Sequence, residues 1–333
     1  MKLPIKPPFP PMEATTAETI PEGPEWCYEP KWDGFRCIVF RDGDEVYLQS
    51  KAGKPLGRYF PDLVFAIGRL EPKSFVLEGE IVIPIGKRFS FDDLLMRIHP
   101  AKSRVEMLAA EHPANLIVFD LLVEPPGKSL VEEPLAERRP RLEKFFATHQ
   151  PDESVFRLSP MTESVAEAKR WLKEAGGNRD GVIAKRADLE YRGGDRTGMV
   201  KVKRLRTVDC VVGGFRYASK GKYVGSLLLG LYDDDGLLHH VGFTSALNAQ
   251  ERKALTPELE DLRKEPGFTG RAPGGPSRWS TERTGEWEPL DPKLVVEVQY
   301  DHFTEGRFRH GTKLLRFRPD KSAKQCTVDQ VTG

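Results

Sequence analysis

Residues 29–36 read EPKWDGFR, and they set Lys31 and Gly34 directly before a predicted β-hairpin. The hairpin comprises residues 35–40 (FRCIVF) and 45–50 (EVYLQS), two runs rich in aromatic and β-branched residues. They flank the sequence RDGD, whose central Asp-Gly pair can adopt the positive φ of a tight turn. We therefore expect Lys31 between a preceding strand and the hairpin, where a strand end presents its amine to a cleft.

A lysine at such a position can serve as a nucleophile. It does so only when its amine is neutral, a state that neighbouring cations or metal ions favour. Gly34 allows the backbone to approach a ligand closely. The K-x-D-G spacing alone also fits a surface turn, so its interpretation depends on the rest of the chain.

The first two hundred residues predict a mixed domain of strands and helices. Residues 1–25 are proline-rich and predict an extended N-terminal arm. Beyond the hairpin, periodicity predicts strands at 75–83, 115–122, 181–186 and 199–204 and helices at 91–98, 135–146 and 163–175. Thr162 is the expected N-cap of the last helix, and the glycines at 176–177 are its expected stop.

After Arg206 the pattern changes to short strands. Strands are predicted at 208–217, 226–232, 237–243, 293–300 and 313–317, with one helix at 249–263. A five-stranded barrel with a helix after its third strand is the OB arrangement. We therefore predict an α+β chain in which a first domain (1–206) of antiparallel sheets with flanking helices precedes a β-barrel OB-fold domain (207–333).

The composition argues against several classes of protein. No apolar run approaches the ~18 residues of a membrane-spanning helix, and the proline-rich first residues lack the apolar core of a secretory signal. Cys27, Cys37, Cys210 and Cys326 fit neither a zinc spacing nor a disulfide scaffold. They indicate reduced thiols in a cytoplasm.

Charge is unevenly distributed along the chain. The whole sequence sums to +1, whereas residues 179–222 hold twelve Lys and Arg against five Asp and Glu, or +7, which leaves −6 for the remainder. A basic stripe of this kind predicts a polyanionic partner. A solvated strand face has the same pattern.

Further motifs carry side chains suited to phosphate or metal binding: EGE at 78–80, VFD at 118–120, DGVIAK at 180–185, YRGGDR at 191–196, KVK at 201–203 and RFRPDK at 316–321. The two glutamates of EGE share a strand face, where paired carboxylates suit a hard cation such as Mg²⁺. Two lysines that share a strand face repel each other unless an anion lies between them. Singly, these motifs also fit ordinary roles, such as a half-exposed strand, a core phenylalanine or a charged terminal strand.

In their order, the motifs K-x-D-G, E-G-E, F-D, D-G-V-x-x-K, K-x-K and R-x-D-K resemble the ordered set of the covalent nucleotidyltransferases. Within that superfamily the chain resembles an ATP-dependent DNA ligase of the compact bacterial two-domain type called ligase C, from about Trp26 to Lys321. The resemblance implies an adenylation (nucleotidyltransferase) domain followed by the OB-fold domain.

This resemblance implies a three-step reaction with ATP and Mg²⁺ or Mn²⁺ as cofactors. Lys31 would attack the α-phosphate of ATP and release pyrophosphate. The AMP would pass to the 5′-phosphate of a DNA nick, and the 3′-hydroxyl would displace AMP to seal the strand. Lys201, Lys203 and the metal ion would favour the neutral form of Lys31.

The resemblance also implies roles for individual residues, with Lys31 as the catalytic residue and Glu80 and Asp180 as metal ligands. Lys51 stands where many ligases carry an arginine, in a motif that captures the 5′-phosphate. The other cofactor-binding residues would be Glu29 at the adenine amine, Arg36 and Glu80 at the ribose or metal, Phe119 stacked on the base, Lys185 in the nucleotide pocket, Arg196, Lys201 and Lys203 at phosphates, and Arg316, Asp320 and Lys321 at the pyrophosphate.

Three other functions are weighed against this one: an RNA ligase, an mRNA-capping guanylyltransferase and a non-catalytic OB-fold nucleic-acid-binding protein. The last has no use for a lysine nucleophile with paired carboxylates. An NAD-dependent ligase is disfavoured because the chain lacks a four-cysteine zinc module. The expected partners are nicked double-stranded DNA and a repair polymerase, and the expected protein is a monomer that acts in DNA repair at the bacterial nucleoid, without a membrane.

Overall fold

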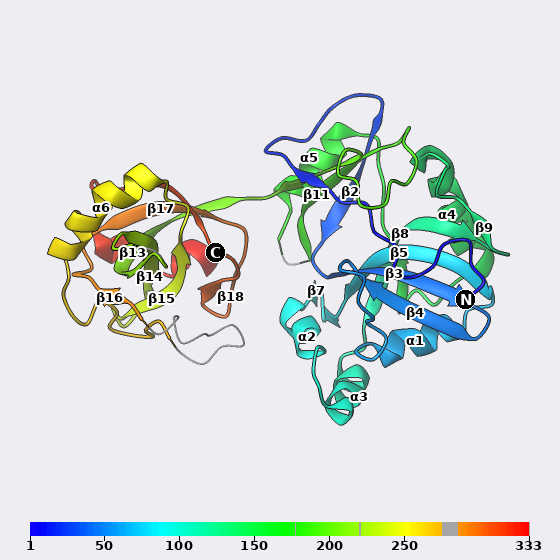
Figure 1. Cartoon of the computed structure of the whole chain (residues 1–333), viewed down its shortest axis with the longest axis horizontal. Coiled ribbons are helices and arrows are strands. Elements are labelled where there is room, and N and C mark those ends of the chain that lie inside the picture. The colour runs from blue at the N-terminus through cyan, green and yellow to red at the C-terminus, as the bar shows by residue number, and fades with distance from the viewer. Residues whose placement is uncertain (177, 220, 275–285, 333) are drawn as a thin grey trace. The chain divides into compact units, whose positions relative to one another are not determined.

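The chain forms two compact units. The computed structural model describes residues 1–176, 178–219, 221–274 and 286–332 (Figure 1), and the chain divides into Met1–Arg204 and Leu205–Gly333. The sequence analysis expected the boundary two residues later, after Arg206. The predicted α+β class, with antiparallel sheets followed by a barrel, is confirmed.

The larger sheet of the first unit is mostly antiparallel. Its order is β10-β8-β5-β3-β4 with β9 beside β8, and the strands are β3 (Phe35–Asp42), β4 (Glu45–Ser50), β5 (Ser74–Val82), β8 (Asn115–Glu124), β9 (Lys128–Ser129) and β10 (Phe156–Leu158). The predicted hairpin is β3–β4, and Gly43 closes it at φ 60°. Because β8 is buried along almost its whole length, Phe119 and Asp120 lie inside the unit.

A smaller sheet has the order β1-β12-β11-β2, with the strands β1 (Thr15–Thr16), β2 (Trp26–Trp32), β11 (Arg179–Arg186) and β12 (Met199–Lys203). Gly181 of β11 is paired with Lys31 on one side and with Lys203 on the other. A Cβ atom at Gly181 would lie 2.0 Å from the carbonyl oxygen of Val202, so no larger residue fits. This close approach brings the two lysine-bearing strands to one point.

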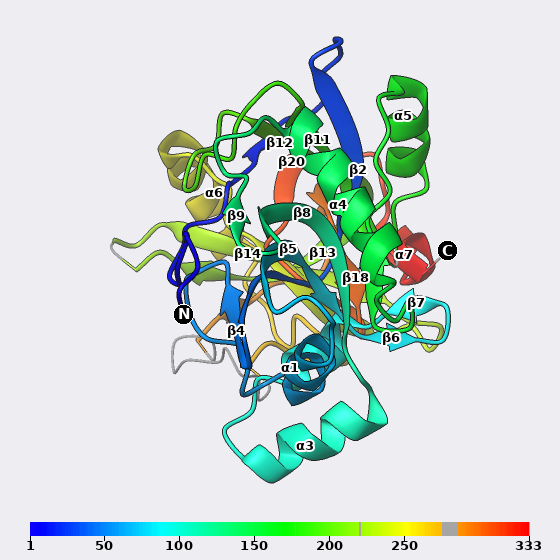
Figure 2. The same cartoon turned by 90° about the vertical axis from the view of Figure 1, so that its right-hand side faces the viewer.

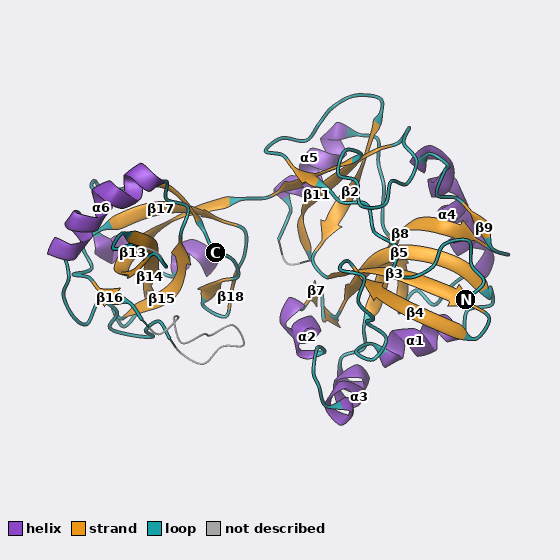
Figure 3. Cartoon of the chain, viewed as in Figure 1, coloured by secondary structure: helices purple, strands orange, loops and turns teal. Residues whose placement is uncertain are grey.

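Helices pack on both sheets of the first unit (Figures 2 and 3). The helices are α1 (Pro61–Gly68), α2 (Phe91–Met96), α3 (Lys102–Glu111), α4 (Leu135–His149) and α5 (Val165–Lys173), and the short hairpin β6 (Pro84–Ile85) with β7 (Arg88–Phe89) precedes α2. α4 packs on β8, and α5 packs on β2 and β11, whereas α3 lies away from the sheets and beside α1.

Two details of the first unit differ from the sequence-based expectation. The N-cap of α5 is Ser164, whose hydroxyl accepts from the Glu167 N–H. Thr162 was predicted for this role, but its backbone instead pairs with Tyr28 of β2. Lys31 was expected beyond the end of a strand, and it lies within β2.

The second unit is a closed five-stranded barrel. Its sheet order is β15-β14-β13-β17-β20, and the strands are β13 (Arg206–Tyr217), β14 (Val224–Tyr232), β15 (Leu238–Thr244), β17 (Val295–Tyr300) and β20 (Lys313–Phe317). The Thr312 N–H donates to the carbonyl of Phe243 at 3.0 Å, and the Thr244 hydroxyl donates to the carbonyl of Thr312 at 2.9 Å. These bonds join the two ends of the sheet.

The helix α6 (Ala249–Asp261) follows the third strand of the barrel, as predicted, and Asn248 begins it with a reciprocal capping box. The unit also contains β16 (Glu288–Pro289), β18 (Phe303–Thr304), β19 (Arg307–Phe308), the 3₁₀ helix η2 (Ala323–Gln325) and α7 (Asp329–Thr332). This order of strands and helix is the predicted OB-fold arrangement.

The four cysteine thiols are free and buried. Burial raises the pKa of the Cys27 thiol to about 12, so it stays a neutral thiol at physiological pH. In the part of the chain that the structure describes, no helix combines the length and the apolar character needed to cross a membrane.

Candidate active site

A cavity of about 540 Å³ lies in the first unit, lined by residues from both of its sheets. Its volume is in the range of small-molecule sites. Of the residues predicted to bind the nucleotide, it brings together Glu29, Lys31, Arg36, Lys51, Glu80, Phe119, Lys185 and Lys201. These residues come from six strands and one turn, so the two sheets have to pack before the site exists.

Lys31 is held on the cavity wall by a buried carboxylate. Its Nζ lies 2.6 Å from Oδ2 of Asp180, and Nζ of Lys203 lies 3.6 Å from the same oxygen. The side chain of Asp180 is 4% exposed and that of Lys31 is 21% exposed. The register of β11 against β2 shifts between Arg179 and Gly181, and a bulge of this kind re-aims the side chain it contains.

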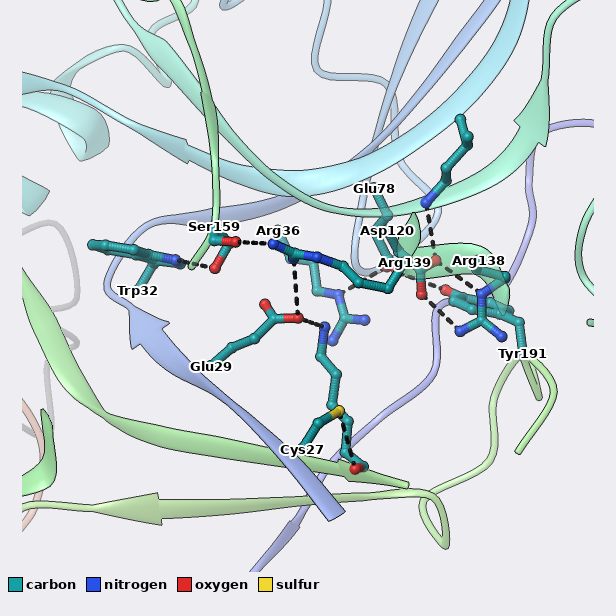
Figure 4. Close-up of polar contacts among 12 residues, drawn as sticks. Cys27, Glu29, Trp32, Arg36, Glu78, Asp120, Arg138, Arg139, Ser159 and Tyr191 are labelled. Carbon is teal, nitrogen blue, oxygen red and sulfur yellow. Dashed lines mark hydrogen bonds and ion pairs between the residues drawn. The ribbon is translucent and has the colours of Figure 1, made fainter. Parts of the chain in front are cut away.

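Glu29 and Lys185 form a second ion pair in the same wall. Oε1 of Glu29 lies 2.8 Å from Nζ of Lys185 and 4.0 Å from a guanidinium nitrogen of Arg139 (Figure 4). Nζ of Lys185 also lies 4.5 Å from the ring centroid of Phe119. Phe119 is 9% exposed, yet its ring lines the cavity, so this part of the wall offers an aromatic surface beside a carboxylate.

Arg36 is fixed by a bridge through Glu78. The Nε of Arg36 donates to one carboxylate oxygen of Glu78 at 2.9 Å, and the Tyr191 hydroxyl donates to the other at 2.9 Å (Figure 4). The Arg36 guanidinium carbon lies 5.3 Å from the Phe119 ring centroid. Phe119 thus has two cations within cation–π distance, one from β3 and one from β11.

Glu80 lies beside the K-x-D-G turn. Its carboxylate accepts from the Gly34 N–H at 3.1 Å. Burial raises the pKa of Glu80 to about 7, although Lys31 and Arg36 act to lower it. A Cβ atom at Gly34 would lie 2.2 Å from the Ile81 carbonyl oxygen, so glycine is required for this approach.

Lys51 and Lys201 also line the cavity, and the charges of Lys203 and Arg196 act on Lys201 from nearby. Burial lowers the pKa of Lys201, and the nearby charges of Lys203, Lys51, Lys31 and Arg196 lower it further. Lys51 and Arg196 contact one oxygen of Glu13, at 3.3 Å and 2.9 Å respectively. This concentration of positive charge favours an anionic ligand.

Three predicted site residues belong to the second unit. Arg316 pairs with Glu297 at 2.6 Å, Lys321 with Asp209 at 2.6 Å, and Asp320 with Arg318 at 2.9 Å. The hydrogen bond from Arg318 holds the pKa of Asp320 at about 2. The RFRPDK motif at 316–321 therefore forms a set of ion pairs at the end of β20.

Two family models match the chain. The model described as "ATP dependent DNA ligase domain" matches residues 11–203, and the one described as "ATP dependent DNA ligase C terminal region" matches residues 220–321. DNA ligase C1 of Mycolicibacterium smegmatis is 45% identical over 342 residues, which cover 99% of this chain and 96% of that protein. DNA ligase C of Mycobacterium tuberculosis is 41% identical over 346 residues with the same coverage.

The chain belongs to the ATP-dependent DNA ligases. This ligase also resembles a solved structure titled as a Lig E DNA ligase, with a TM-score of 0.56 and 17% identity over 92% of this chain and 99% of that one. That likeness concerns the fold.

Family membership decides between the functions that the sequence analysis compared. The prediction of an ATP-dependent DNA ligase of the compact bacterial type is confirmed. The RNA ligase, the capping enzyme and the non-catalytic OB-fold protein are disfavoured, because both parts of the chain match DNA ligases. ATP and a divalent cation are the cofactors of this family.

The basic stripe of this ligase is partly neutralised by the fold. Among the described residues of 179–222, at least six cations have carboxylate partners: Arg179 with Glu174, Lys185 with Glu29, Arg186 with Asp188, Arg192 with Glu190, Arg196 with Glu13, and Lys203 with Asp180. Lys220 lies outside the described residues. Asp180, Asp188 and Glu190 are already subtracted in the +7 counted along the sequence, so of these partners only Glu13, Glu29 and Glu174 reduce the positive charge of this segment further.

Sequence reasoning about this ligase missed two residues of the site. Arg139 lies on the buried side of α4, together with Leu135 and Leu142. An arginine within the apolar stripe of a predicted helix could have marked it as a buried, functional residue. Glu13 lies in the N-terminal arm, where no periodicity marks it. Its position beside Lys51 and Arg196 follows only from the tertiary structure.

Proposed function

We propose that this ligase seals nicks in double-stranded DNA through an adenylate on Lys31, formed in the cavity of the first unit. In the first step the Lys31 amine forms a bond to the α-phosphorus of ATP, and the bond to pyrophosphate breaks. The observation that carries the proposal is the position of Lys31, whose Nζ is held at 2.6 Å by the buried Asp180 on the wall of that cavity. The ion pair with Asp180 positions the Lys31 side chain, and the amine can attack only once it has lost its proton.

The base of ATP fits the wall formed by Phe119, Glu29 and Lys185. The Phe119 ring offers a stacking surface, and Lys185 and Arg36 approach that ring at 4.5 Å and 5.3 Å. Both cations near Glu29 contact its Oε1, which leaves Oε2 to accept a hydrogen bond from the adenine amine. Arg36, anchored on Glu78, lies in reach of the same wall for the ribose.

The phosphates of ATP and of the nick fit the cations Lys51, Arg196, Lys201 and Lys203. Phosphoryl transfer depends on positioning and on neutralising negative charge, and these residues supply that charge. Arg316, Asp320 and Lys321 of the second unit would orient pyrophosphate in the first step. They already form ion pairs that an incoming phosphate would have to rearrange.

Glu80 and Asp180 would hold Mg²⁺ or Mn²⁺, because these cations prefer oxygen ligands. The pKa of Glu80 is raised because the cost of burying its charge exceeds the stabilisation from its cationic neighbours. A bound metal ion would favour the ionised form of this carboxylate. When bound, the ion would neutralise charge on the phosphate oxygens.

The DNA substrate needs a 5′-phosphate next to a 3′-hydroxyl, and a gap-filling polymerase leaves that product. We therefore assign the ligase to DNA repair downstream of such a polymerase.

Labelling with α-³²P-ATP tests this function. The wild-type protein should retain the label on a denaturing gel with Mg²⁺ or Mn²⁺. Lys31→Ala should not retain it, because the amine that forms the bond to AMP is removed. The matched control is Lys73→Ala, an exposed lysine of the same unit, which should label normally. Full labelling of Lys31→Ala would contradict the assignment, and labelling by GTP in place of ATP would contradict the choice of nucleotide.

A further inference from the structure

The carboxylate of Glu13 occupies a position between two cations that we assign to phosphate binding. Its Oε2 lies 3.3 Å from Nζ of Lys51 and 2.9 Å from a guanidinium nitrogen of Arg196. Three segments that are remote in sequence meet at this oxygen: the N-terminal arm, the turn after β4 and the loop before β12. Glu13 also lines the nucleotide cavity.

The arm is fixed by its backbone, so the place of Glu13 does not depend on its ion pairs alone. The Glu13 N–H donates to the carbonyl of Asp195 at 2.8 Å, and the Gly194 N–H donates to the carbonyl of Pro11 at 3.0 Å. The Met12 N–H donates to the Tyr191 hydroxyl at 3.1 Å. These bonds attach the arm to the loop that carries Arg196 and direct the carboxylate to the cavity.

The charges around Glu13 are those of an anion site. The charges of Lys203, Lys51, Lys31 and Arg196 all act on Lys201 there. Asp180 is the carboxylate that pairs with Lys31 and Lys203. The hydrogen bond from Lys51 lowers the pKa of Glu13, so the side chain is ionised at neutral pH. Glu13 therefore provides, from within the protein, the negative charge that a substrate phosphate would bring.

We propose that Glu13 is an internal competitor of the substrate phosphate, and that a phosphate group binds Lys51 and Arg196 only after it displaces the Glu13 carboxylate. The proposal rests on the phosphate-binding role given to these two cations above. A side chain that occupies a binding site lowers the apparent affinity of every ligand that binds at that site, and it does so by the same factor for each ligand. It therefore weakens the binding of substrate and product alike.

The expected change in phosphate affinity depends on how exposed the ion pairs of Glu13 are to solvent. The side chains of Lys51 and Arg196 are 58% and 66% exposed, so their pairs with Glu13 are surface ion pairs that solvent screens. Removing the competing charge should tighten phosphate binding about two- to five-fold, the range of exposed ion pairs.

The test uses the full chain with Glu13→Gln, and with Glu18→Gln as the matched control. Glu18 is an exposed carboxylate of the same arm, so its change alters the net charge equally. Binding is measured by fluorescence anisotropy, in chelator to prevent sealing, to a duplex whose nick carries a 5′-phosphate and to the same duplex with a 5′-hydroxyl. The KM for ATP in self-adenylation is measured separately with Mg²⁺.

We expect Glu13→Gln, unlike Glu18→Gln, to tighten binding of the 5′-phosphate nick with no change for the 5′-hydroxyl nick, or to lower the KM for ATP. The first result identifies the phosphate of the nick as the group that displaces Glu13, and the second identifies the nucleotide. Weaker binding, or no change in either assay, would overturn the proposal, because Glu13 would then only support the two cations. Glu13→Asp keeps the charge and should stay close to wild type.

Lys51→Ala separates this proposal from the proposed function. If Lys51→Ala weakens phosphate binding while Glu13→Gln does not tighten it, the competitor role of Glu13 is wrong and the phosphate role of Lys51 stands. If Lys51→Ala binds the phosphorylated nick and ATP as wild type does, the phosphate role assigned to Lys51 is itself wrong.

Discussion

Arg138 and Asp120 form a buried two-pronged ion pair next to Phe119, and breaking it should destabilise the first unit. The Nε and one terminal nitrogen of Arg138 donate to the two carboxylate oxygens of Asp120 at 2.9 Å and 2.8 Å (Figure 4). Their side chains are 3% and 6% exposed. We predict that Arg138→Met, which keeps most of the apolar volume, leaves the carboxylate of Asp120 buried without its partner.

The magnitude follows from these contacts. Removing one partner of a buried ion pair costs about 3–5 kcal/mol of unfolding free energy. Arg138 also donates to the Glu133 carbonyl at 2.7 Å, and that bond is lost as well. We therefore expect a loss near the upper end, about 4–5 kcal/mol at neutral pH. A loss of that size is a large part of the stability of a typical domain.

The loss should depend on pH. Burial by itself would raise the pKa of Asp120, but the charge and hydrogen bonds of Arg138 outweigh it and lower the pKa. In the wild type this group therefore stabilises the fold above its unfolded-state pKa, and the gain disappears as pH falls through the lowered value. In Arg138→Met, the burial of Asp120 is no longer offset by the charge of Arg138. The loss of unfolding free energy relative to the wild type should therefore grow as pH rises from about 4 to 7.

Urea unfolding followed by circular dichroism at pH 4.5 and pH 7.5 measures both quantities. The double variant Asp120→Asn with Arg138→Met should recover most of the loss at pH 7.5, because the amide oxygen can still accept from the Leu121 N–H, which now donates to Asp120 at 2.9 Å. A deficit below about 1 kcal/mol at pH 7.5, or one equal at both pH values, would refute the reasoning.

Two further predictions concern the cavity and the second unit. In chelator at pH 8, the free energy of unfolding in urea should be higher for Glu80→Gln than for the wild type by at most about 3 kcal/mol, because burial raises the pKa of Glu80 to about 7. This gain in stability should fade towards pH 5. Equal stability of the two proteins at pH 8 would contradict the raised pKa. A fragment of residues 1–204 should fold, since it forms one compact unit, but it should react with ATP about a hundredfold more slowly than the whole chain, because it lacks Arg316, Asp320 and Lys321. Quench-flow labelling of both proteins would reveal equal rates if those residues have no role in the first step.

Much of the architecture could be read from the sequence, because it depends on local pattern. The alternating pattern of residues 75–83 corresponds to β5, and the apolar run at 115–122 corresponds to β8. The five short runs after Arg206 correspond to the barrel strands. Residues 29–36 located Lys31 because the spacing K-x-D-G can be recognised without knowing what surrounds it. The helices α1 and α3 were not predicted, and their apolar residues form only a weak stripe on short helices.

The chemistry of the site depended on the tertiary structure. Lys31 and Asp180 are 149 positions apart, and Glu13 and Arg196 are 183 positions apart. Hydrophobic periodicity describes which face of one strand is buried, and it carries no information on which side chain of a distant strand will lie opposite. The sequence determined which cations and carboxylates are available to the ligase. Only the packing of its two sheets decided that Asp180 would hold Lys31 and that Glu13 would lie between Lys51 and Arg196, because charges affect one another through their separation in space.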